Sequence, residues 1–433
     1  MFLAVRELVF ARTRVLLMAS VIALISVLMV ILSGLSSGLV DDGVSGLQRT
    51  PAQAFAFQEG TKTDSAFSRS VVTEEQAAAW AAQPGVEHAE LMGNAIVNAH
   101  TGGGMAIDLT LFGIVPGSFL EPTAGEGTQL SGPRDIILSE TARDEGVAVG
   151  DTVTVDRLGT EMTVVGFTED KRTFGHVDIA YVPLATWQEI NAGTLEGAAT
   201  EPRAYTEASV VAIQGTDGSL PDLAAGDAAA GTASKTVEES FDSSPGYSAE
   251  TMTMSMIIAF LYAISALVVG AFFSIWTVQR LRELAVLRAM GASTGYLMRD
   301  SIIQAALILV VSVAFGVLVG LGLGSGLEGT GMPFSLQTGP ILQGALLLIV
   351  LGLIGAGLAI GISTRYLDIE GEPHGEYYSL VLFATEKIPI DVVTIMLVIG
   401  LVLTGTLNVS EAFAGFGNDI VITIAGLFVL TGG

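Results

Sequence analysis

A cluster of thioether and carboxylate side chains lies at the start of one long apolar run of the chain. Glu250, Met252, Met254 and Met256 fall within the segment PGYSAETMTMSM. Thioether sulfur is a soft ligand that can hold haem iron axially, and a nearby carboxylate could be a second ligand. Met252 and Met256 lie four residues apart and would share one face of a helix. Methionines also fill irregular helix interfaces, so plain packing is the alternative interpretation of the same residues.

The rest of the chain offers little further chemistry. There are no cysteines, which excludes a disulfide framework and a thiolate metal site. The stretch 226–236, GDAAAGTASKT, lacks the lysine position of an ATPase phosphate loop. The four histidines are scattered along the sequence: His88, His100, His176 and His374. We therefore expect no catalytic residue, no intrinsic cofactor, no metal other than haem iron, and no ATPase motor in this chain.

A basic amphipathic stretch, 277–301, lies between two long apolar runs. Its apolar residues recur at helical spacing, and Gly291 follows them as a natural helix C-cap. Its charged residues are Arg280, Arg282, Glu283, Arg288, Arg299 and Asp300. Positive charge is typical of cytoplasmic loops of membrane proteins. On charge alone, the stretch is either a loop that lies on membrane lipids or a docking helix for a cytoplasmic motor.

Composition indicates an integral membrane protein with a large acidic domain. Half of the 433 residues are hydrophobic, and several apolar runs exceed the roughly 18 residues that suggest a membrane span. The net charge is −25, and most of the 44 acidic residues lie between residues 41 and 250. No basic face exists to neutralise phosphates, so we expect no nucleic-acid partner.

The apolar runs predict four membrane spans and a domain between the first two. The expected spans are 15–40, 251–278, 301–327 and 339–363. A short amphipathic helix at 1–14 precedes them, and its arginines predict a cytoplasmic N-terminus in the plasma membrane. Residues 41–250 are then an extracytoplasmic α+β domain, and 279–300 are a cytoplasmic loop. Within the domain we expect helices at 73–82 and 135–145, strands at 86–99, 105–114, 177–183 and 209–213, and a hairpin at 150–170.

Small residues gather at two places in the spans. Ser33, Gly34, Ser36, Ser37 and Gly38 end the first span, where they allow close helix packing or leave room for a ligand. Glycines recur at i, i+4 in the third and fourth spans, where they fit close packing: Gly316, Gly320 and Gly324, and Gly357 and Gly361.

The segment 280–293, RLRELAVLRAMGAS, resembles the signature loop of the MacB/FtsX-like family of ABC transporter permeases. The order of one span, a large outer domain and three spans is similar to the topology of that family. The resemblance implies a separate ABC ATP-binding subunit and a dimer of the permease. It also implies that this subunit docks at the loop residues Arg280, Arg282, Glu283, Arg288 and Gly291.

The opening segment, residues 1–40, resembles actinobacterial haem-exporting permeases of this family. The resemblance implies that haem is captured sideways from the membrane, between the first two spans and near the outer leaflet. Of the candidate haem ligands it favours Met256 and Glu250, with Met252 next. We therefore expect a haem exporter driven by its partner ATPase through a mechanical movement of the spans.

The end of the chain departs from that family. Residues 364–382 form a linker, and 383–433, which open with FATEKIPIDVV, resemble the first part of a divalent anion:sodium symporter. They predict one or two extra hydrophobic helices. The sequence stops inside an apolar run, so we expect a fragment that does not transport on its own. A gene fusion, a frameshift and an error of gene assembly are all consistent with this tail.

Three other functions fit parts of the sequence. The same permease could move a lipoprotein, a peptide or a drug. It could also act as a non-transporting signal transducer whose outer domain activates a cell-wall hydrolase, as FtsX does. A secondary carrier would depend on residues 383–433 alone. These residues resemble only the first part of a divalent anion:sodium symporter, which argues against a carrier.

Overall fold

The computed structural model describes residues 12–279, 286, 290–328, 330 and 332–367. The chain divides into two compact units, Met1–Thr364 and Arg365–Gly433, and nearly all of the second lies outside the described residues. The predicted extra helices of 383–433 and the linker 364–382 therefore fall outside them, the first few linker residues excepted. So do most of the predicted helix 1–14 and four of the predicted docking residues: Arg280, Arg282, Glu283 and Arg288.

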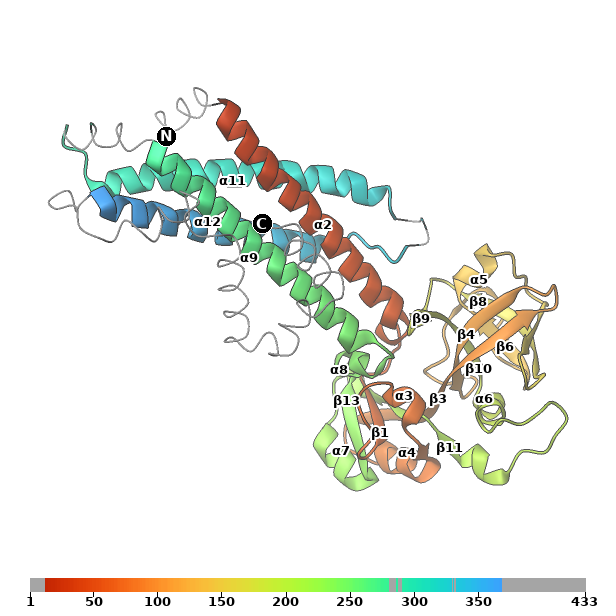
Figure 1. Cartoon of the computed structure of the whole chain (residues 1–433). Helices are drawn as coiled ribbons and strands as arrows, with labels where there is room; N and C mark the ends of the chain where they lie inside the picture. Colours follow the sequence, from red (N-terminus) through yellow and green to blue (C-terminus); the bar gives the residue numbers. More distant parts are fainter. Residues whose placement is uncertain (1–11, 280–285, 287–289, 329, 331, 368–433) are drawn as a thin grey trace, which may run out of the picture. The chain divides into compact units, whose positions relative to one another are not determined.

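Four long helices carry the apolar runs. They are α2 (Arg12–Gln48), α9 (Tyr247–Gln279), α11 (Thr294–Ser325) and α12 (Thr338–Leu367). Each contains a segment long and apolar enough to cross a membrane. An α+β domain lies between α2 and α9 in the sequence (Figure 1). The predicted fold class, four spans with an α+β domain after the first, is confirmed for the described residues.

The domain is built on one large mixed sheet. Eleven strands form it, and the central order is β13-β1-β12-β3-β4-β10-β6-β8-β5, with β7 beside β3 and β8, and β9 beside β10. The strands are β1 (Ala54–Gln58), β3 (Val86–Thr101), β4 (Ala106–Ile114), β5 (Ala124–Gly127), β6 (Asp135–Leu138), β7 (Thr152–Val155), β8 (Glu161–Thr168), β9 (Thr173–Phe174), β10 (Val177–Pro183), β12 (Val210–Gly215) and β13 (Thr232–Thr236). A separate pair joins β2 (Val72–Thr73) and β11 (Glu207–Ala208).

Short helices cover the sheet and connect its strands. They are α3 (Ala66–Arg69), α4 (Glu74–Ala81), α5 (Glu140–Asp144), α6 (Leu184–Asn191), α7 (Leu223–Ala230) and α8 (Val237–Ser240). The predicted helix at 73–82 is confirmed, and Thr73 and Gln76 form a capping box at its start. The predicted strands and the hairpin at 150–170 are confirmed as well.

One predicted helix of the domain is wrong over its first half. Residues 135–138 form strand β6, and only the short helix α5 follows. Ile136, Ile137 and Leu138 are fully buried, because β6 lies inside the sheet between β10 and β8. A continuous apolar run is typical of a strand buried on both faces, and periodicity alone does not separate it from a helix.

Both faces of the sheet are packed. Alternate residues of β4 point to opposite sides, so Leu111 belongs to one apolar cluster and Phe112 to the other. The first cluster holds Trp80 of α4 and Trp187 of α6. The second cluster holds Val44 and Leu47, which are residues of α2. The first long helix thus ends inside the core of the domain.

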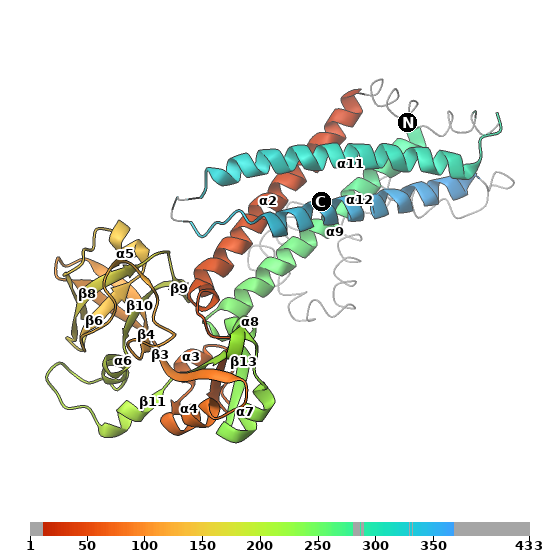
Figure 2. The same cartoon turned by 180° about the vertical axis from the view of Figure 1, so that it is seen from behind.

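Helix α2 therefore continues past the predicted end of its span at residue 40. It runs to Gln48, and Val44 and Leu47 are fully buried against the domain. No proline interrupts this stretch, and burial of apolar side chains stabilises the extra turns. Helix α9 also begins before the predicted span, at Tyr247. Helix α2 ends at the domain and α9 begins there, as Figure 2 shows from behind.

Glycines let the long helices approach closely. Gly316 of α11 faces the backbone of Ala23 and the side chain of Ser26 in α2, and Gly320 faces Val30. The Ser26 hydroxyl donates a hydrogen bond of 3.0 Å to the carbonyl oxygen of Val313. The predicted packing role is confirmed for Gly316 and Gly320.

The small residues of α2 have two separate uses. Gly34 and Gly38 face Phe334 and Pro333 of the link between α11 and α12, and the Ser335 N–H donates to the Gly34 carbonyl oxygen at 3.0 Å. Ser36, in contrast, lines a cavity beside α9. No atom lies within 4 Å of a Cβ placed at Gly357, so the predicted close packing is wrong there. The surroundings of Gly361 are not described, so its packing role stays a prediction.

Candidate functional site

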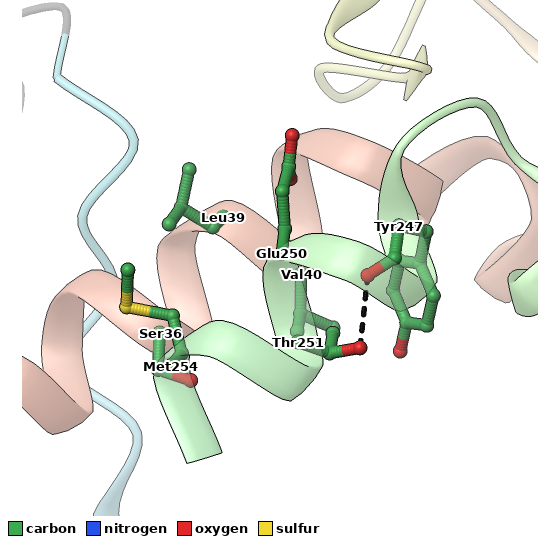
Figure 3. A pocket seen from close by; sticks show the side chains of 7 residues that line it. All are labelled: Ser36, Leu39, Val40, Tyr247, Glu250, Thr251 and Met254. Carbon is green, nitrogen blue, oxygen red and sulfur yellow. Dashed lines mark hydrogen bonds between the residues drawn. The ribbon is translucent and has the colours of Figure 1, made fainter. Parts of the chain in front are cut away.

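A small slot lies between α2 and α9 at the end nearest the domain. Ser36, Leu39 and Val40 line it from α2, and four residues line it from α9: Tyr247, Glu250, Thr251 and Met254 (Figure 3). Its cavity volume is about 10 Å³. Drug-sized ligands occupy pockets of roughly 300–1,000 Å³. The slot is thus closed to a ligand of that size unless the two helices separate.

Local sequence brings the α9 residues to the slot. Gly246, with a φ of 78°, turns the chain into α9, and Tyr247 packs against Phe241 with their ring centroids 5.9 Å apart. The Thr251 hydroxyl donates to the Tyr247 carbonyl oxygen at 2.8 Å, within the first turn (Figure 3). Glu250 and Met254 are four residues apart, so they share the face that meets α2.

The methionines predicted as haem ligands lie on other faces of α9. Met252 is 74% exposed and Met256 is 45% exposed, and neither lines the closed slot. Met254 lies on its wall instead. Of the three residues predicted to bind the haem iron, Glu250, Met252 and Met256, only Glu250 lines the slot. Met254 could have been found from the sequence, because it follows Glu250 at i+4.

A chain of polar contacts joins Glu250 to the domain. The Nε2 atom of His176 lies 2.8 Å from Oε2 of Glu250, and its Nδ1 atom lies 3.0 Å from Oδ2 of Asp42 in α2. Lys171 donates to Oδ1 of Asp42 at 2.7 Å. His176 thus bridges a carboxylate of α2 and a carboxylate of α9. No local pattern points to this residue, because it lies 74 positions from Glu250 in the chain.

Charge favours this arrangement. Burial alone would lower the pKa of His176, but its hydrogen bonds to Asp42 and Glu250 outweigh burial and raise the pKa. A protonated imidazole donates from both ring nitrogens, which matches two carboxylate acceptors.

The turn that carries His176 is fixed to α2. His176 has a φ of 63°, in the left-handed region that follows Gly175 between β9 and β10. The Gly175 N–H donates to the Gly43 carbonyl oxygen at 2.9 Å, and the Thr173 N–H donates to the Ser45 hydroxyl at 2.9 Å. The turn, the end of α2 and strand β10 therefore move together, and Glu250 connects α9 to them.

The predicted docking loop is only partly within the described chain. Gly291 adopts a φ of 98°, the left-handed conformation expected of a residue that ends a helix. Helix α11 begins soon after it, and the Ser293 side chain accepts a hydrogen bond from the Tyr296 N–H. Arg280, Arg282, Glu283 and Arg288 are outside the described residues, so their docking role stays a prediction.

Profiles of two protein families match this chain. The profile of the MacB-like periplasmic core domain matches residues 15–230, and the profile of the FtsX-like permease C-terminal region matches residues 255–366. Together the matched regions cover most of the domain and most of the four long helices, and they leave out residues 231–254, which hold β13, α8 and the first turns of α9.

Individual proteins are also similar. The putative hemin transport system permease protein HrtB of Staphylococcus haemolyticus is 24% identical over 362 residues, which cover 83% of this chain and 95% of that protein. The protein of the same name from Staphylococcus epidermidis is 34% identical over 113 residues, or 26% of this chain and 32% of that protein. The solved extracellular domain of the noncanonic ABC-type transporter YknZ from Gram-positive bacteria is 16% identical, with a TM-score of 0.31, over 43% of this chain and 98% of that domain.

The two family matches agree with the helix order and with the domain between α2 and α9. A permease of this kind is a non-catalytic membrane subunit that works with an ATP-binding subunit. The chain belongs to the MacB/FtsX-like family of ABC transporter permeases.

Proposed function

We propose that this permease extrudes haem from the membrane through the slot between α2 and α9. The observation that carries the proposal is the pairing of Glu250 and Met254 on the slot face of α9, opposite Ser36, Leu39 and Val40 of α2. A mostly apolar wall with a few polar groups suits a flat apolar ligand with a polar centre. The similarity to relatives named for hemin transport supports the same cargo.

The ligands of the haem iron are proposed on α9. Glu250 and Met256 are the first choice, with Met252 next. Met252 and Met256 are exposed in the closed state, where a cargo arriving sideways from lipid would meet them first. The cargo would then move into the slot, where Met254 forms part of the wall. A carboxylate would be a hard ligand of the iron, and a thioether a soft one.

The driving movement is proposed to enter at the loop after α9. The residues Arg280, Arg282, Glu283, Arg288 and Gly291 would dock the ATP-binding subunit on the cytoplasmic side. The domain would then lie outside the plasma membrane, with the N-terminus in the cytoplasm. Two copies of the permease would act with two ATPase subunits. Nucleotide binding would bias the α2–α9 gap between open and closed, and closure would push the cargo outward.

The first test is haemin binding to the full-length chain in lipid nanodiscs, followed by absorption spectroscopy. We expect saturable binding, and a changed Soret band in Glu250→Ala and Met256→Ala. Met290→Leu is the matched control, because Met290 is an exposed methionine within the predicted docking loop and does not line the slot. A folded wild-type chain that binds no haemin would remove haem as the cargo and leave the family assignment untouched.

A further inference from the structure

We infer that His176 is a positioning residue of the slot, which holds the carboxylate of Glu250 while the slot is closed and competes with the cargo for it. The inference rests on the proposed function, since it concerns the same carboxylate. It adds a residue of the domain to a site otherwise built from two membrane helices.

The His176 side chain belongs to the α2 side of the slot. Its Nδ1 atom is 3.0 Å from Asp42 of α2, and the N–H of the preceding Gly175 is bonded to the Gly43 carbonyl oxygen of the same helix. Lys171 holds Asp42 from the other side at 2.7 Å. The imidazole is therefore tied to α2 by backbone and side-chain bonds, and it moves with that helix.

Glu250 belongs to the other side. It lies in the first turn of α9, where it lines the slot, and its Oε2 atom is 2.8 Å from Nε2 of His176. The pair thus crosses from one wall of the slot to the other. A movement that separates the first turn of α9 from α2 lengthens this contact, together with the hydrogen bond of 3.1 Å that the Ser244 hydroxyl donates to the Gly43 carbonyl oxygen.

The slot must open to admit a porphyrin, since its cavity volume is about 10 Å³. Opening therefore breaks the pair and frees the carboxylate. While the pair holds the two walls together, a porphyrin does not fit between them, so its iron cannot reach the Glu250 carboxylate. The His176 contact and the iron contact are thus alternatives, and the first closes the slot in the absence of cargo.

The first arm of the test is haemin affinity. His176→Ala and His176→Asn both remove the contact, and asparagine also tolerates the left-handed backbone of this position, which guards against a folding defect. We expect both variants to bind haemin about fivefold more tightly than the wild type, the factor that corresponds to one exposed ion pair. His100→Ala is the matched control, because His100 forms a similar pair with Asp156, at 2.7 Å, on the domain.

The second arm needs no cargo. The chain has no cysteine, so Ser36→Cys and Met254→Cys introduce a single thiol pair across the slot. We expect oxidative cross-linking of this pair in the full chain to slow when His176→Ala or His176→Asn is added, since the slot then spends less time closed. Adding His100→Ala should leave the rate unchanged.

The outcomes separate this inference from the proposed function. Tighter haemin binding together with slower cross-linking supports the role of His176. Weaker binding would make His176 an iron ligand or a structural residue, and an unchanged cross-linking rate would mean that it does not hold the slot closed; either result overturns the inference. If the wild type binds no haemin, the proposed cargo fails, and the cross-linking arm alone decides on His176.

Discussion

The imidazole of His176 and the carboxylate of Glu250 meet at 2.8 Å, across the gap between the domain and the first turn of α9. Because the turn of His176 is bonded to α2, this contact connects the two helices that line the slot. A movement of either helix would therefore displace the turn of the domain that carries His176. The contact thus gives this permease a physical connection between α9 and the domain.

The two neighbouring methionines of α9 should have different roles. Met256→Leu keeps the side-chain volume but removes the sulfur, so the Soret band of bound haemin should shift if Met256 is an iron ligand. Met254→Leu changes only a wall of the slot, so affinity should fall while the band stays in place. Absorption titrations of both variants beside Met290→Leu measure this. A shift in Met254→Leu with none in Met256→Leu would exchange the two roles.

Close packing of α2 on α11 should tolerate no side chain at Gly316. A Cβ atom there would meet the carbonyl oxygen of Ala23 and the side chain of Ser26. We expect Gly316→Ala to destabilise the helix pair by about 1–3 kcal/mol, the usual cost of overpacking. Gly322→Ala in the same helix meets no atom within 4 Å, so it should be neutral or stabilising. Thermal unfolding in nanodiscs compares the two, and equal midpoints would contradict the packing.

The domain should lose stability as Asp178 ionises. Burial raises the pKa of this carboxyl group, and the acidic neighbours Glu145 and Asp42 add to the effect against Lys171. A carboxyl group whose pKa is higher in the folded state stabilises the fold when protonated, and this contribution is lost as pH rises through the folded pKa. Asp178→Asn should therefore raise the unfolding temperature at pH 7 and have little effect below about pH 3.9, the unfolded pKa of Asp. A lower unfolding temperature at pH 7 would show that the ionised form is the stabilising one.

The loop after α9 should matter for coupling and not for cargo binding. Arg288→Ala removes one charge from the predicted docking segment, so ATP hydrolysis by the complex should respond less to haemin. Haemin affinity of the permease alone should stay at the wild-type value, because the slot lies at the other end of α9. Parallel ATPase and titration assays measure both quantities. Full haemin-stimulated ATPase activity in Arg288→Ala would exclude this arginine from docking.

The membrane helices were predictable because their signal is local. A run of apolar residues reveals a span whatever its neighbours are, and Thr73 with Gln76 likewise marks a helix start within four residues. Strand β6 was mistaken for a helix because its burial depends on β10 and β8, which come later in the chain. Local patterns do not contain that information.

The candidate site was predictable in part for the same reason. Glu250 and Met254 share a helix face by spacing alone, although the prediction favoured Met256. His176 lies 134 positions from Asp42 and 74 from Glu250, so only the folded sheet brings the three together. The extension of α2 into the domain core depends on Val44 and Leu47 finding apolar partners there, which the sequence does not reveal.

The most direct test of the proposed function is haem transport by the assembled exporter. The permease and its ATP-binding subunit are placed in liposomes that carry haemin in the membrane and apomyoglobin in the lumen, with ATP added outside. We expect the lumenal apomyoglobin to acquire the spectrum of metmyoglobin only when ATP is hydrolysed, and we expect Glu250→Ala to slow this transfer. A complex that hydrolyses ATP but gives the same rate of haem transfer with and without ATP would contradict haem export by this permease.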